Sequence, residues 1–151
     1  MKVYHTYSKS HGFDINKLDF KRGIFTLPET HKFFLDDPWS PDTNWGNSVV
    51  ELEIDPSSSK VYTNYDQVNA IKDLVKDKKL KHIILNDWME IAAGSQEDNR
   101  RIWHAIDKVI GTILVRKGYD LWHLTAEMMY GDVWAILNKR AIRSVNFQSK
   151  K

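Results

Sequence analysis

Residues 48–54 read Ser-Val-Val-Glu-Leu-Glu-Ile, and they carry the clearest strand signal in the chain. The aliphatic residues Val50, Leu52 and Ile54 alternate with two glutamates, so they would share one face of an extended strand. The Asp-Pro pair that follows is typical of a turn and ends the strand. A strand with one buried face and one polar face is therefore expected in the middle of the chain.

Two further strands are expected before this one. Residues 3–7 alternate β-branched and aromatic side chains, and residues 23–27 read Gly-Ile-Phe-Thr-Leu, a short second strand. Residues 8–20 between them are expected to form a loop or a short helix. A proline then opens residues 29–35, which suit a single short helix. Residues 36–47 hold two prolines and two tryptophans among turn residues and are expected to form a loop.

The part of the chain that follows is expected to be helical. Apolar residues recur there at three- and four-residue spacing, which predicts helices over about 65–78, 83–93 and 102–114. Asp66 is the expected N-cap of the first helix. The Lys117-Gly118 pair is the expected stop of the third, because a basic last turn followed by glycine is a common helix end.

Strands return at the end of the chain, over about 119–124, 133–137 and 142–147. Strands at both ends with helices inserted between them favour an α+β fold over a doubly wound sheet. A length of 151 residues fits one domain, so residues 1–151 are expected to form a single domain.

Composition excludes several classes of protein. Hydrophobic residues make up 42% of the chain, which is too many for a disordered chain, and the net charge of +2 gives no reason to expect nucleic-acid binding. No apolar run approaches 18 residues and the first residues lack a signal-peptide core, so no membrane association is expected. The absence of cysteine excludes disulfides and thiolate chemistry. A soluble, cytoplasmic protein is expected.

Common catalytic motifs are missing from the sequence. There is no glycine-rich phosphate loop and no Gly-x-Ser-x-Gly elbow, and the six histidines show no metal-binding spacing, so no metal site is predicted. Any chemistry must come from residues that are scattered along the chain.

Five segments, in their order, resemble the ADP-ribosyltransferase superfamily. They are an opening strand with a histidine over 3–8, a Gly-Ile-Phe-Thr strand over 23–30, a Lys-Gly-Tyr-Asp turn over 117–120, and closing segments over 131–138 and 141–145. The chain resembles above all the small phage-borne members, among them anti-CRISPR ADP-ribosyltransferases. The resemblance implies a split β-sandwich with a helical insertion, and the host cytoplasm as the location of a phage-encoded protein.

The resemblance also implies a reaction and its binding residues. NAD would be the substrate, ADP-ribose would be transferred to a protein or nucleic-acid acceptor, and nicotinamide would be released. His5 and Thr6 would contact the ribose and the carboxamide, with Tyr7 in the same NAD-binding segment. Phe25 would stack on the nicotinamide ring. Thr6 stands where the family usually has glycine, and its side chain could narrow the approach to the carboxamide.

The catalytic carboxylate has two candidates. Glu127 lies where small relatives place their acid, and it is the preferred residue. Asp132 directly precedes the expected strand 133–137, where larger relatives place theirs. A carboxylate at either position would stabilise an oxocarbenium-like transition state by its charge.

Another class of function fits the same segments. The chain would then be a catalytically inactive ADP-ribosyltransferase-like protein of phage type that acts by direct contact with a host protein. Thr6 and the unsettled position of the acid favour this alternative. A related possibility needs no NAD and uses the tryptophan-rich loop, with Trp39 and Trp45, as the contact surface.

Overall fold

The computed structural model describes residues 1–7, 12–18, 20, 23–28, 48–91, 96–125 and 132–148. Its strands are β1 (Lys2–Tyr7), β2 (Ile24–Pro28), β3 (Ser48–Ile54), β4 (Val61–Asn64), β5 (Leu121–Leu124), β6 (Val133–Ile136) and β7 (Ile142–Gln148). Its helices are α3 (Gln67–Leu74), α4 (Lys78–Ile91) and α5 (Gln96–Arg116), with 3-10 turns η1 (Ile15–Lys17), η3 (Pro56–Ser58) and η4 (Lys139–Ala141). This mixture confirms the predicted α+β class.

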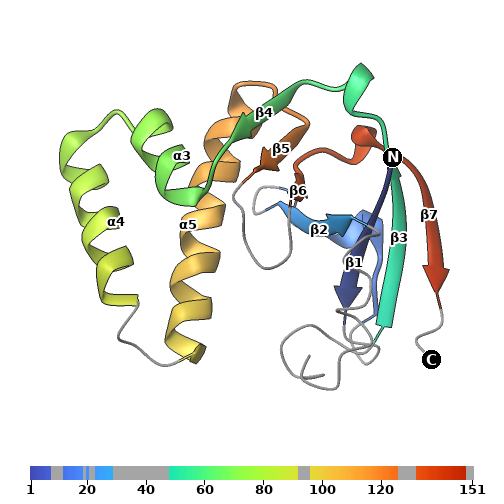
Figure 1. The fold of residues 1–151 in the computed structure, drawn as a ribbon, viewed down its shortest axis with the longest axis horizontal. Helices are drawn as coiled ribbons and strands as arrows, with labels where there is room; N and C mark the ends of the chain where they lie inside the picture. Colours follow the sequence, from blue (N-terminus) through green and yellow to red (C-terminus); the bar gives the residue numbers. More distant parts are fainter. Residues whose placement is uncertain are drawn as a thin grey trace.

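The seven strands form one sheet in the order β4-β5-β6-β2-β1-β3-β7. The β4–β5 pairing is parallel, and the other pairings are antiparallel. Figure 1 shows α3, α4 and α5 beside the β4–β5 end of the sheet, with β1, β3 and β7 at the other end. None of the helices in the described ranges is long and apolar enough to cross a membrane.

Strand β2 joins two halves of this sheet. Its first residues, Ile24 to Thr26, pair with β6, whereas its last two residues pair with Tyr4 and Val3 of β1. The halves β4–β5–β6–β2 and β2–β1–β3–β7 therefore share one strand. A buried apolar cluster, here called the shared cluster, is drawn from both halves: Val3, Ile24, Val50, Leu52, Ile54, Leu121, Ile136 and Ala141.

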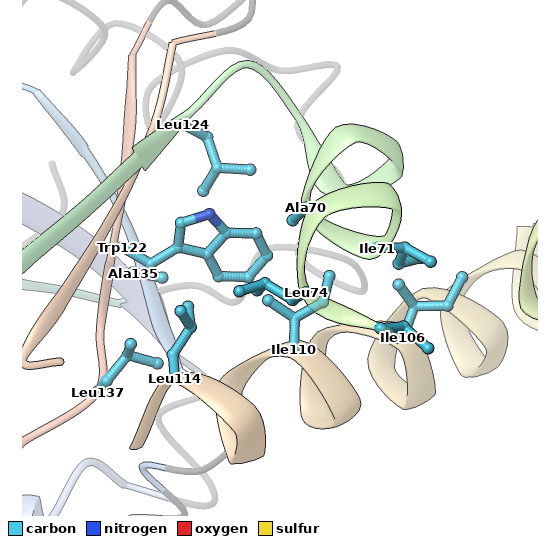
Figure 2. Packing of buried hydrophobic residues seen from close by; sticks show 11 residues of the cluster. Ala70, Ile71, Leu74, Ile106, Ile110, Leu114, Trp122, Leu124, Ala135 and Leu137 are labelled. Carbon is cyan, nitrogen blue, oxygen red and sulfur yellow. The ribbon is translucent and has the colours of Figure 1, made fainter. Parts of the chain in front are cut away.

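A second buried cluster, the helix-side cluster, lies between the β4–β5–β6–β2 half and the helices. Trp122 of β5 is fully buried at its centre, among side chains of α3 and α5 (Figure 2). Its indole N–H donates to the Asn64 side-chain oxygen over 2.7 Å, which satisfies the one polar atom that the ring buries. Burial of large side chains on both faces fixes this half of the sheet.

Six predicted strands are present, and 48–54 has the predicted bounds. Strand β4 was not predicted, because its sequence, Val-Tyr-Thr-Asn, has no alternation between apolar and polar residues. Its partner is also distant in the sequence: the Lys60 carbonyl oxygen accepts from Asp120 N over 2.8 Å. The predicted helix over 29–35 and the loop over 36–47 lie outside the described residues.

The helices begin and end partly as predicted. Asp66 caps α3 by accepting from Asn69 N over 2.8 Å, but α3 stops at Leu74 instead of continuing to about 78. Helix α4 starts at Lys78, five residues before the predicted 83, because the Asp77 carboxylate caps it by accepting from Leu80 N over 2.9 Å. The prediction missed this cap inside a lysine-rich run. Gly118 ends the turn after α5 with a φ of +83°, as the Lys-Gly signal indicates.

Candidate functional site

The face of the sheet that carries the shared cluster becomes polar two residues further along its strands. Ile24, Leu121 and Ile136 are in the cluster, and alternation places Thr26, His123 and Trp134 on the same face. These last three are direct neighbours, because Trp134 pairs with Thr26 on one side and with His123 on the other. This row of polar and aromatic residues, here called the polar row, is the candidate site.

His5 stands at the junction of the two halves, next to the polar row. The last backbone pairing between β1 and β2 joins Tyr4 and Leu27, and immediately beyond it His5 Nδ1 contacts the Phe25 carbonyl oxygen at 2.7 Å. A carbonyl oxygen only accepts, so Nδ1 carries the hydrogen of this bond. The imidazole thus continues the link between the strands where the backbone ladder stops.

Asp132 and His123 form a pair at the other end of the polar row. His123 Nε2 lies 3.0 Å from Asp132 Oδ2, and the side chains are 18% and 54% exposed, respectively. The imidazole stacks on the indole of Trp134 with ring centroids 3.9 Å apart and planes 7° from parallel. Three strand spacings separate His123 from β1, or roughly 14 Å along the sheet.

Phe25 projects to the other side of β2. Its ring packs against the helix-side cluster and meets Trp122 edge-on, with centroids 5.8 Å apart. The structure therefore does not bring the ring of Phe25 onto the face that carries Thr26 and Trp134. The predicted nicotinamide contact of Phe25 stays a prediction, and the ring has a packing role in this structure.

Thr6 and Tyr7 lie on opposite faces of β1. Thr6 pairs with Val49 of β3, which belongs to a small cluster separate from the shared cluster. Tyr7 packs against the shared cluster and lies in an aromatic group with Phe13 and Phe147, at centroid distances of 5.7 and 6.2 Å. Of the predicted NAD-binding residues, His5 and Tyr7 share the face of the polar row, and Thr6 and Phe25 do not.

Of the two candidate catalytic carboxylates, one lies within the described residues and one does not. Glu127 lies outside the described residues. Asp132 is described, and it sits beside the polar row as the partner of His123. The predicted roles of both carboxylates stay predictions.

A third carboxylate of the same region, Asp120, has a structural role. It is buried, its Oδ1 pairs with Arg140 Nε at 2.6 Å, and its Oδ2 accepts from the backbone N–H of Lys60 over 3.0 Å. The bond to Lys60 fastens the start of β4 to the start of β5, and the pair with Arg140 ties η4 to the same point. Both oxygens of Asp120 are therefore engaged in bonds that stabilise the fold.

Among the described residues, Asp55 and Tyr62 have clearly shifted pKa values, and both lie away from the polar row. Hydrogen bonds from the hydroxyls of Ser57 and Ser58 hold the pKa of Asp55 well below its usual range. Burial, together with a 2.6 Å hydrogen bond to the Asp73 carboxylate, raises the pKa of Tyr62. Both shifts accompany hydrogen bonds that hold connections of the fold in place.

The sequence analysis predicted none of the three residues of the polar row, and His123 is the one that pairs with a predicted residue, Asp132. Its pairing with Asp132 depends on the register of the β5–β6 pair, which joins His123 to Trp134. The sequence signal was the alternation of Leu121 with His123 and of Ile136 with Trp134, which places all four on one face. Within the described ranges, no group of three histidine or carboxylate side chains could hold a metal ion.

The chain is similar to a solved structure described as "Crystal structure of an anti-CRISPR protein". The two are 17% identical, the alignment covers 98% of this chain and 95% of that chain, and the TM-score is 0.47. No protein-family model and no curated protein matches the sequence. The residues of this chain must therefore carry the functional argument.

Proposed function

We propose that the protein binds NAD at the polar row and transfers ADP-ribose from it to a protein or nucleic-acid acceptor, with release of nicotinamide. The observation that carries the proposal is the position of His5. The resemblance assigns a ribose contact to a histidine on the opening strand, and His5 lies where β1 and β2 stop pairing, with its imidazole fixed by the Phe25 carbonyl oxygen at 2.7 Å. A fixed ring orients a substrate without a further loss of side-chain entropy.

The charges in the site suit the reaction. As the bond between ribose C1′ and the nicotinamide nitrogen breaks, its electron pair neutralises the pyridinium, and positive charge develops on the ribose. A carboxylate nearby stabilises that charge. Glu127 and Asp132 are the two candidates, and Asp132 is held at the end of the polar row by His123. The acceptor then attacks C1′, and its proton passes to the carboxylate, which acts as a general base, or to water.

The test is incubation of the purified protein with NAD, in the presence of a bacterial lysate as acceptor source. We expect nicotinamide to be released and label from adenine-labelled NAD to enter protein or nucleic acid. His5→Ala should reduce release by about 100-fold, the order of effect of removing one well-placed polar group from a catalytic site, because it removes the fixed ring whose Nε2 would contact the ribose. His82→Ala, which changes an exposed histidine on α4, is the matched control and should leave release unchanged.

A second candidate function is binding without catalysis. It is favoured by the packing of the Phe25 ring against Trp122, because that ring is then engaged in the fold. Thr6, which stands in place of the usual glycine, favours it as well. The protein would then contact a host protein directly.

Thermal unfolding in the presence of NAD separates these functions. A ligand at 100 times its dissociation constant stabilises the folded state by about 2.7 kcal/mol, which is a measurable shift in midpoint. A transferase shows the shift and releases nicotinamide, whereas an inactive relative that retains NAD binding shows the shift alone. A binding protein that has no use for NAD shows neither.

A further inference from the structure

In the pair formed by His123 and Asp132, the histidine is held in place by its surroundings and the aspartate is exposed to solvent. The side chain of His123 is 18% exposed, and its ring lies flat on the ring of Trp134 with centroids 3.9 Å apart. Trp134 is itself held, since its carbonyl oxygen accepts from the buried Thr26 hydroxyl over 2.7 Å. Asp132, in contrast, precedes β6 and is 54% exposed. The histidine therefore positions the carboxylate, and not the reverse.

The bond also fixes which atoms remain for a ligand. A carboxylate accepts only, so His123 Nε2 carries the hydrogen of the 3.0 Å bond to Asp132 Oδ2. Among the described residues, Asp132 Oδ1 has no hydrogen-bond partner. A carboxylate has about four acceptor positions, and the described residues use one of those of Asp132, so its Oδ1 is the atom to which a ligand would donate.

We infer that His123 is a positioning residue that holds Asp132 as the carboxylate facing the ribose hydroxyls of NAD. This inference rests on the proposed function and narrows it, because it chooses Asp132 over Glu127 as the acid. The ligand chemistry that fits is a pair of neighbouring hydroxyls, which can donate to the open oxygen. Without the hydrogen bond from Nε2, an exposed aspartate would turn freely, and its charge would be spread over many orientations.

A double-mutant cycle on nicotinamide release tests the inference. His123→Phe keeps an aromatic ring over Trp134 but removes the N–H donor, and we expect kcat to fall about 10-fold, the lower end of what a hydrogen bond to a charged group is worth. KM for NAD and the unfolding midpoint should change little. Asp132→Asn should lower kcat at least as much. In the Asp132→Asn background, His123→Phe should have no further effect, because the histidine acts only through the carboxylate.

Two variants sharpen the comparison. His123→Gln can still donate from its amide and should recover part of the lost kcat. His82→Phe makes the same substitution on the exposed surface of α4, where the ring hydrogen-bonds Asn86 one turn further on, and should leave kcat unchanged. Should His123→Phe fail to fold, nitrogen NMR of the wild-type imidazole still reports whether Nε2 carries the proton, and Asp132→Asn should alter that signal.

The outcomes that would overturn the inference differ from those that would overturn the proposed function. Additive losses in the double mutant, or full activity of Asp132→Asn beside an inactive Glu127→Gln, would remove the role of the His123–Asp132 pair and leave the transferase intact. Wild-type protein that neither binds NAD nor releases nicotinamide would end both proposals together. That result is seen before any variant is made.

Discussion

At the scale of single residues, Phe25 shows how one residue packs with its side chain on one face of the sheet and orients a neighbour with its backbone on the other. Its carbonyl oxygen holds His5, while its ring meets Trp122 in the helix-side cluster. Phe25→Ala should lower the free energy of unfolding by about 2–4 kcal/mol, because it opens a cavity beside a buried indole. Urea denaturation measures this loss, and Phe25→Tyr, which keeps the ring, is the control. Unchanged stability of Phe25→Ala would mean that the ring contributes nothing to packing, and a selective loss of NAD binding would then favour the nicotinamide contact.

Tyr62 gives a prediction for alkaline solution. Because burial and Asp73 raise the pKa of this phenol in the folded state, its neutral form stabilises the fold below pH about 10, and the contribution is lost as the pH rises beyond that value. Tyr62→Phe removes the titrating group, so its free energy of unfolding should fall less steeply between about pH 9.5 and 11 than that of the wild type. Denaturation at several pH values measures the slope. Parallel curves for the two proteins would contradict the assignment.

At the scale of elements, α4 depends on a cap that the sequence analysis did not find. Asp77→Ala removes the carboxylate that accepts from Leu80 N and should cost about 1 kcal/mol. Hydrogen exchange should then speed up in the first turn of α4. Lys76→Ala changes the preceding exposed residue and should leave exchange unchanged. Equal exchange in the two variants would show that another group begins the helix.

Strands β3 and β4 show which elements a sequence can predict and which it cannot. The pattern of 48–54 predicts β3 with its bounds because alternation is a property of the residues themselves. Strand β4 and the His123–Asp132 pair depend on registers between distant segments, Val61 with Leu121 and His123 with Trp134, which no local pattern contains. The resemblance pointed to His5, Thr6, Tyr7 and Phe25 for NAD, and to Glu127 ahead of Asp132 for the acid. The hydrogen-bond partner of Asp132, His123, came only from the pairing of β5 with β6.

At the scale of the whole molecule, the two clusters share β2, β5 and β6, so they should lose their structure together. Leu52 is fully buried in the shared cluster, and Leu52→Ala should lower the free energy of unfolding by about 2–5 kcal/mol. Fluorescence of the tryptophans, which include Trp122 on the opposite side of the β4–β5–β6–β2 half, should report the same lowered midpoint as circular dichroism. Two separate transitions would show that the halves unfold independently.

The order of strands in the sheet also has a consequence for synthesis. The half made of β1, β3 and β7 takes its strands from residues 2–7, 48–54 and 142–148, so β3 waits for a partner that emerges from the ribosome nearly ninety residues later. During that interval the backbone N–H and C=O groups along one edge of β3 are unpaired, and its aliphatic side chains are exposed. Both favour pairing with other chains. A nascent chain halted before β7 should therefore be prone to aggregation and in need of a chaperone. Pairing of β7 with β3 then covers that edge and removes the tendency to aggregate.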